Sequence, residues 1–133
     1  MATGRSDFPN QVNNSLIFPG VFRGILDARA RSIPDDVVLA AAKELARGAE
    51  RKGLSADHLL PTMEEREVFP QIAAAVGDTA VRLGIARERL SHDEFLERAR
   101  VLMGRPTRLV RALARAHLTP PMPSPHTELR RNR

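Results

Sequence analysis

The chain has no cysteine, no tyrosine and no tryptophan, and only two lysines among its 133 residues. Without cysteine it cannot form a disulfide, a thiolate metal site or a cysteine nucleophile, and this composition fits a reducing cytoplasm. No run approaches the roughly 18 consecutive apolar residues that a membrane span requires, and the first residues carry no basic or apolar leader segment. The sequence therefore predicts a soluble, cytoplasmic protein with room for one small domain and with no membrane partner.

Two patterns that carry chemistry in other proteins are also missing. No G-x-G-x-x-G turn occurs, so the chain lacks the strand-turn-helix cradle that binds a dinucleotide pyrophosphate. The four histidines are too scattered for the short spacing of a helical zinc site, so no metal site is expected. Triad-type residues that are adjacent in sequence, such as Ser91-His92-Asp93, are expected to be caps and surface groups rather than a catalytic site.

Positive charge is abundant but unevenly distributed. The net charge is +5, yet seven arginines and only one acid, Glu128, follow residue 104. We therefore expect two parts, 1–104 and 105–133, with a boundary at Gly104-Arg105-Pro106. The second part should begin with an amphipathic helix and become disordered from Pro120 onward. Its arginines could contact phosphates, but it has no tyrosine, tryptophan or phenylalanine for base stacking, so any nucleic-acid binding should be non-specific. A solvated tail is the simpler explanation, so a nucleic-acid partner is not favoured.

Apolar residues recur at intervals of three and four, whereas no run alternates with a period of two. The fold class expected is mainly α. Capping residues place the ends of the helices: Ser32 is a candidate cap, Gly53 a stop, and Ser91 with Glu94 a start. The predicted helices begin at Pro19, run from Pro34 to Lys52, run from Met63 to Gly84 with an interruption at Pro70, and run from Ser91 to Gly104.

The most specific segment is ATGRSDFPNQVNNSLIFPGVFRG, from Ala2 to Gly24, which continues as Ile25-Leu26-Asp27-Ala28-Arg29. It resembles the malate-binding loop of the malic enzymes and is close to verbatim for the small bacterial type. A weaker similarity extends to about residue 103. The resemblance implies the carboxyl-terminal, helical part of an α/β Rossmann-type NAD-binding domain whose strands lie mostly outside this chain. It also implies that Gly20 and Gly24 pack against the rest of that domain.

Malic enzymes convert malate to pyruvate and carbon dioxide with NAD or NADP and with Mg²⁺ or Mn²⁺. The resemblance implies that Asn14 first, and Asn13 second, contact the substrate. An amide suits this role because it offers donors and an acceptor without adding charge. The alternative is that the pair caps a helix and makes turn hydrogen bonds, as Asn-Asn pairs commonly do.

The family relies on a tyrosine as general acid, a lysine as general base, acidic metal ligands and a glycine-rich nucleotide turn, all upstream of the loop. This chain has no tyrosine, and Lys43 and Lys52 match no catalytic position. We therefore expect a fragment that is inactive alone, either a remnant or one part of a split enzyme, with the N-terminal half of the enzyme as its partner. One alternative is a small helical binding module whose basic tail contacts nucleic acid or an acidic partner. Another is a chain that does not fold alone and exposes Phe18, Phe22 and Ile25. Cofactor contacts, including the choice between NAD and NADP, are not assigned.

Overall fold

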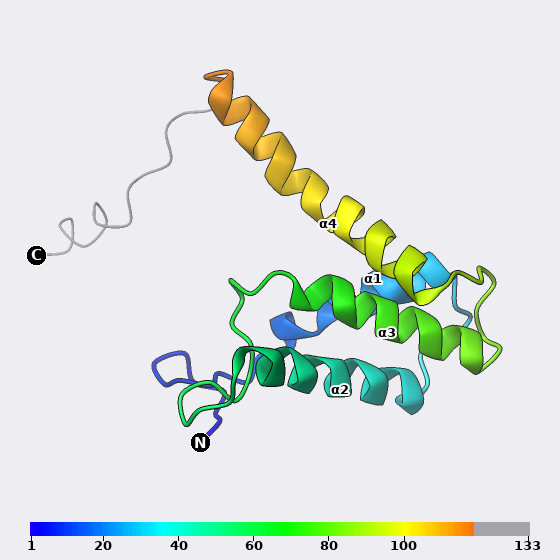
Figure 1. The fold of residues 1–133 in the computed structure, drawn as a ribbon, viewed down its shortest axis with the longest axis horizontal. Coiled ribbons are helices and arrows are strands. Elements are labelled where there is room, and N and C mark those ends of the chain that lie inside the picture. The colour runs from blue at the N-terminus through cyan, green and yellow to red at the C-terminus, as the bar shows by residue number, and fades with distance from the viewer. Residues whose placement is uncertain (119–133) are drawn as a thin grey trace, which may run out of the picture. The chain divides into compact units, whose positions relative to one another are not determined.

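The computed structural model describes residues 1–118, and these contain helices but no strand (Figure 1). The mainly α fold class predicted from the sequence is confirmed. The described residues belong to two units, Met1–Met103 and a unit that begins at Gly104. The elements in chain order are the 3₁₀ turn η1 (Asn14–Leu16) and the helices α1 (Phe18–Ala28), α2 (Asp35–Lys52), α3 (Val68–Arg82) and α4 (His92–Arg115).

Helix α3 forms the centre of the first unit, because both α1 and α2 pack against it. The glycine face of α1 makes this packing close. A Cβ atom at Gly20 would lie 2.6 Å from Cβ of Ile72, and one at Gly24 would lie 2.7 Å from Cβ of Val76. The close packing expected for these glycines is present, and the partner within the described residues is α3, most of which lies in the same matched segment of the chain.

The apolar core has two clusters of buried side chains, and α3 contributes to both. One cluster joins side chains from α1, α2 and α3, including Val21, Val37 and Ile72. The other contains Ala80 and Phe95, which is the largest fully buried side chain. Phe95 lies in the first turns of α4 and packs over Gly77, where a Cβ atom would lie 2.8 Å from the ring. The start of α4 is thus part of the first unit's core.

The helix ends agree with the sequence at some positions and depart from it at others. Helix α2 ends at Gly53, whose φ of 95° suits glycine, as predicted. Its N-cap is Pro34 and makes no side-chain capping bond, so Ser32 is not the cap. Helix α3 begins at Val68 rather than at Met63, and Pro70 lies in its first turn instead of interrupting it. Proline is tolerated there because the first N–H groups of a helix have no intrahelical partner.

Helix α4 begins as predicted, with a reciprocal cap between Ser91 and Glu94. The Glu94 carboxylate accepts from the Ser91 N–H at 2.8 Å, and the Ser91 hydroxyl accepts from the Glu94 N–H at 3.4 Å. The helix then continues through Gly104, Arg105 and Pro106 to Arg115, so the predicted helix break there is wrong. Proline removes only one helix hydrogen bond, and the strong helix formers Arg, Leu and Ala dominate the following turns.

The disorder predicted from Pro120 onward concerns residues outside the described part of the chain. Within residues 1–118, no helix combines the length and the apolar character needed to cross a membrane.

Candidate functional site

The segment that resembles a malate-binding loop lies ahead of α1 and is closed by backbone bonds. The Val12 N–H donates to the Thr3 carbonyl at 2.7 Å, and the Thr3 N–H donates to the Asn10 carbonyl at 3.3 Å. Within the loop, Arg5 pairs with Asp7 at 2.6 Å on the surface. The loop therefore folds back on itself before the chain reaches the asparagine pair.

The two predicted substrate residues have different environments. Asn13 is the N-cap of η1, where its side-chain oxygen accepts from the Ser15 N–H at 2.9 Å. Asn14 is the first residue of η1; it is exposed, and its amide has no hydrogen-bond partner among residues 1–118. Asn13 thus makes the turn bond that the alternative interpretation predicts, whereas the Asn14 amide is available to a ligand.

A third asparagine, which sequence reasoning missed, anchors the loop. Asn10 is 7% exposed and has a left-handed backbone with φ of 57°. Its amide nitrogen donates to the Ala56 carbonyl at 2.8 Å, and its amide oxygen accepts from the Leu59 N–H at 2.6 Å. The only sequence signal was the tolerance of asparagine for left-handed conformations.

The segment that Asn10 holds connects α2 to α3 and has its own polar centre, Glu65. This carboxylate accepts from the Thr62 N–H at 3.1 Å, lies 3.0 Å from Nε2 of His58, and pairs with Nζ of Lys52 at 3.1 Å. Partial burial opposes ionisation, but these hydrogen bonds outweigh it and lower the pKa of Glu65 to about 2. The bond to Glu65 also raises the pKa of His58. Each group therefore favours the charged form of the other.

The stretch that follows the loop, Phe22 to Arg29, contains a buried carboxylate. Asp27 is 1% exposed and accepts two hydrogen bonds from Arg23, at 2.9 and 2.6 Å, while Arg98 of α4 lies 3.1 Å away. The opposite side of α1 presents apolar side chains to solvent: Phe18, Phe22 and Leu26 are 46%, 52% and 62% exposed. Among the residues that the alternative of a chain that does not fold alone named as exposed, Phe18 and Phe22 are exposed in this fold and Ile25 is partly buried.

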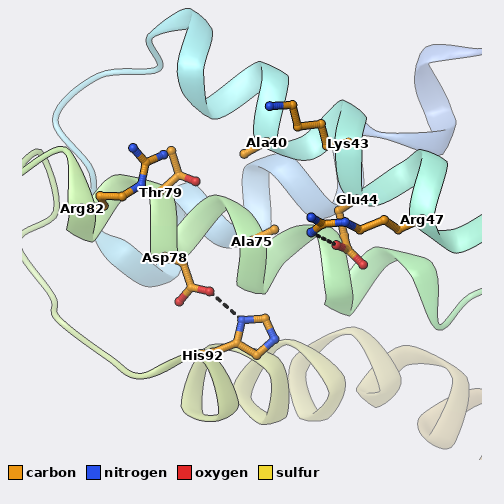
Figure 2. Close-up of a pocket in the computed structure, with 9 residues that line it drawn as sticks. All are labelled: Ala40, Lys43, Glu44, Arg47, Ala75, Asp78, Thr79, Arg82 and His92. Atoms are coloured by element: carbon orange, nitrogen blue, oxygen red, sulfur yellow. Dashed lines mark hydrogen bonds and ion pairs between the residues drawn. The ribbon is translucent and has the colours of Figure 1, made fainter.

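A groove of about 390 Å³ lies between α2 and α3, with the start of α4 at its side. Figure 2 shows that its two acids are engaged: Asp78 points to His92, whose Nδ1 lies 2.6 Å away, and Glu44 points to Arg47. Glu44 also accepts from Arg51 at 2.9 Å. Neither Asn13 nor Asn14 reaches this groove, so it is separate from the predicted substrate loop. Its lining residues are Ala40, Lys43, Glu44, Arg47, Ala75, Asp78, Thr79, Arg82 and His92.

The described residues do not fit the metal and the dinucleotide that the resemblance implies. No group of three or more His, Cys, Asp or Glu side chains within residues 1–118 could hold a metal ion. The same residues contain no strand, and hence no strand-turn-helix cradle for a pyrophosphate. What this part of the chain offers is a folded loop with one unengaged amide, next to a helix with an exposed apolar face.

Comparisons with known proteins give the class and then the family. Residues 1–81 match the family model described as malic enzyme, NAD binding domain. This match places residues 1–81 in the class of NAD-binding domains. The chain belongs to the malic enzyme family.

Individual relatives agree with this assignment. The bifunctional malic/malolactic enzyme of Bacillus subtilis is 44% identical over 102 residues, which are 77% of this chain and 25% of that protein. The NAD-dependent malic enzyme of Geobacillus stearothermophilus is 47% identical over 66% of this chain and 18% of its own length. The crystal structure of Entamoeba histolytica malic enzyme superposes with a TM-score of 0.84 and 38% identity, covering 92% of this chain and 25% of that one. The chain therefore spans about a quarter or less of these relatives.

Proposed function

We propose that this chain is the carboxyl-terminal, helical part of the Rossmann-type NAD-binding domain of an NAD(P)-dependent malic enzyme. In this proposal it contributes the Asn13-Asn14 loop to malate binding, while the enzyme converts malate to pyruvate and carbon dioxide in the cytoplasm. The observation that carries the proposal is the Asn14 amide, exposed and without a partner among the described residues, in the loop that resembles the malate site.

The two asparagines have different roles in this proposal. The Asn14 amide donates to a carboxylate or to the hydroxyl of malate, which it can do without adding charge beside the nicotinamide. Asn13 keeps η1 in shape through its bond to the Ser15 N–H at 2.9 Å, and so sets the direction in which Asn14 points. Substrate contact by Asn13 is secondary, because its side-chain oxygen is already engaged.

The remaining chemistry must come from outside these 133 residues. The chain has no tyrosine to act as general acid, and its described residues hold no cluster for Mg²⁺ or Mn²⁺. We therefore expect no activity from the chain alone. The partner in this proposal is the N-terminal portion of the enzyme, and the exposed apolar face of α1 is the surface that a doubly wound domain would turn toward its sheet.

The test is complementation. The purified chain is mixed with the part of the Bacillus subtilis relative that precedes the matched segment, and malate-dependent reduction of NAD or NADP is measured with Mg²⁺ or Mn²⁺. We expect activity from the mixture and none from either part alone. Asn14→Ala should raise the KM for malate about tenfold, because a tenfold loss of affinity corresponds to the loss of about one hydrogen bond. Asn13→Ala should have a smaller effect.

Ser6→Ala is the matched control, because Ser6 is an exposed residue of the same loop. It should leave the KM for malate unchanged. Activity of the chain alone would refute the proposed incompleteness, and an Asn14→Ala mixture with normal malate KM would refute the proposed substrate contact. The alternative of a helical module that binds nucleic acid gains no support from the family match.

A further inference from the structure

We infer that Asn10 is a positioning residue for malate binding: it clamps the substrate loop to the segment between α2 and α3, so that the Asn14 amide is presented in one orientation. This inference rests on the proposed function. Asn10 itself does not contact substrate, since its side chain is directed at backbone groups of the chain.

The side-chain amide of Asn10 both donates and accepts hydrogen bonds. Its nitrogen donates to the carbonyls of Ala56, at 2.8 Å, and Met1, at 3.3 Å, and its oxygen accepts from the Leu59 N–H at 2.6 Å. A primary amide is the group that donates and accepts in this way within one side chain. Because the residue is only 7% exposed, water cannot readily replace these partners.

The backbone at Asn10 adds a second constraint. With φ of 57° the chain bends at this residue, and the Asn10 carbonyl accepts from the Thr3 N–H at 3.3 Å. Asparagine adopts this conformation more readily than other residues with a side chain. Asn13 follows three residues later, a distance that the chain spans with at most about 10 Å of reach. The clamp is therefore close enough to control the asparagine pair.

The segment between α2 and α3, to which Asn10 binds, is held in place by its own hydrogen bonds and ion pairs. Ser55 and His58 exchange backbone hydrogen bonds of 3.3 and 3.2 Å, and Glu65 holds His58 and Lys52 at 3.0 and 3.1 Å. Lys52 is the last residue of α2, so the network connects this segment to a helix of the core. Asn10 thus ties the loop to a rigid support.

The asparagine pair lies between two anchors. On one side is Asn10, and on the other is Leu16, which is 4% exposed in the core. Between them, the side chain of Asn13 makes a local bond to Ser15 and that of Asn14 makes none among the described residues. Loss of the Asn10 clamp would leave the pair held from one side only, and the cost would appear in malate binding.

The experiment compares Asn10 variants of the full 133-residue chain in the complemented enzyme. Asn10→Gly keeps the left-handed backbone but removes the side-chain bonds, so we expect the KM for malate to rise about tenfold. The KM for NAD or NADP should change less than about twofold, because the clamp acts on the malate loop. Asn10→Asp keeps an acceptor for the Leu59 N–H but turns a carboxylate oxygen toward the Ala56 carbonyl at a buried position, so its malate KM should rise at least as much as that of the glycine variant. Ser6→Ala, an exposed residue of the same loop, is again the control and should behave as the native chain.

A second measurement needs no activity. Amide hydrogen exchange of the chain alone should accelerate in Asn10→Gly at residues 11–16 and at Leu59, and stay unchanged in the core of α3. Unchanged exchange at residues 11–16, or a glycine variant with native malate KM, overturns the inference. A parallel loss of malate and NAD(P) affinity together with a lower melting temperature also overturns it, because that is the result of a general structural role. The proposed function fails separately, if Asn14→Ala has no effect on malate KM.

Discussion

A buried carboxylate is the most consequential single residue outside the loop. Asp27 is 1% exposed and is charge-paired with Arg23 of its own helix and with Arg98 of α4. A buried charge is stable in a folded protein only when it is paired and hydrogen-bonded. Removal of one partner leaves the remaining charges uncompensated, which lowers the free energy of unfolding. Asp27 belongs to the stretch that resembles the malic enzymes, but its contacts give it a structural role, because they join α1 to the start of α4.

Asp27→Asn should therefore destabilise the chain by about 2–4 kcal/mol, because the amide removes the charge while Arg23 and Arg98 remain. The free energy of unfolding, measured by urea denaturation at neutral pH, checks this. Glu97→Gln is the control, an exposed residue of α4 whose change should stay within about 0.5 kcal/mol. Equal stability of the two variants would contradict the assigned role of Asp27.

At the same scale, the sequence revealed the asparagine pair but not its anchor. Asn13 and Asn14 stand out because they are adjacent and lie in a recognisable run. Asn10 could not be singled out, since its partners are 46 and 49 residues away and are backbone groups, which carry no signature of their own. Asp27 was similarly hidden, because the arginine of α4 that neutralises it is far along the chain.

Among the elements, the segment between α2 and α3 has the clearest pH dependence. Folding lowers the pKa of Glu65 to about 2, so its stabilising contribution is present above the ordinary value of 4.5 and is lost as pH falls toward 2. Folding raises the pKa of His58 above 6.5, chiefly through the bond to Glu65. The contribution of His58 is therefore complete below pH 6.5 and is lost as pH rises through the raised value.

We expect hydrogen-exchange protection of the Thr62 and His58 amides, corrected for intrinsic rates, to be highest between the two ordinary pKa values of 4.5 and 6.5 and to fall on both sides. Glu65→Gln should lower this maximum and flatten the profile, because it removes the charge that both His58 and Lys52 face. Glu64→Gln changes the exposed neighbour and should retain the native profile. A Glu65→Gln profile with the native maximum would show that the carboxylate does not hold the segment.

Helix positions were largely predictable, but helix partners were not. The cap at Ser91 and the stop at Gly53 are local signals, and the structure has both. Pro70 and Pro106 were expected to interrupt helices and do not, because a first turn and a run of strong helix formers accommodate them. The close packing of Gly24 on α3 depends on which helix is its neighbour, and a periodic pattern contains no such information.

On the scale of the whole molecule, the main feature of the described residues is an exposed apolar row on α1. The chain covers 25% of the Bacillus subtilis relative, and α1 exposes Phe18, Phe22 and Leu26 along one side while its glycine side is fully packed. The two phenylalanine rings lie 5.6 Å apart, so they form a continuous apolar patch. Such a row at intervals of four residues is typical of a helix face that is covered in the complete protein.

This patch leads to a prediction about assembly. Phe22→Lys should weaken association with the complementing N-terminal portion about tenfold or more. Burial of the exposed half of a phenylalanine side chain contributes roughly 1.5 kcal/mol to the free energy of association, and the lysine loses this contribution. The same substitution should reduce self-association of the chain alone in sedimentation experiments, with helix content by circular dichroism unchanged. Leu39→Lys is the matched control, since Leu39 of α2 is also 52% exposed but lies outside the patch. If both substitutions weakened complementation equally, the effect would belong to added charge or to general exposure, and the α1 face would lose its role as the surface that receives the rest of the domain.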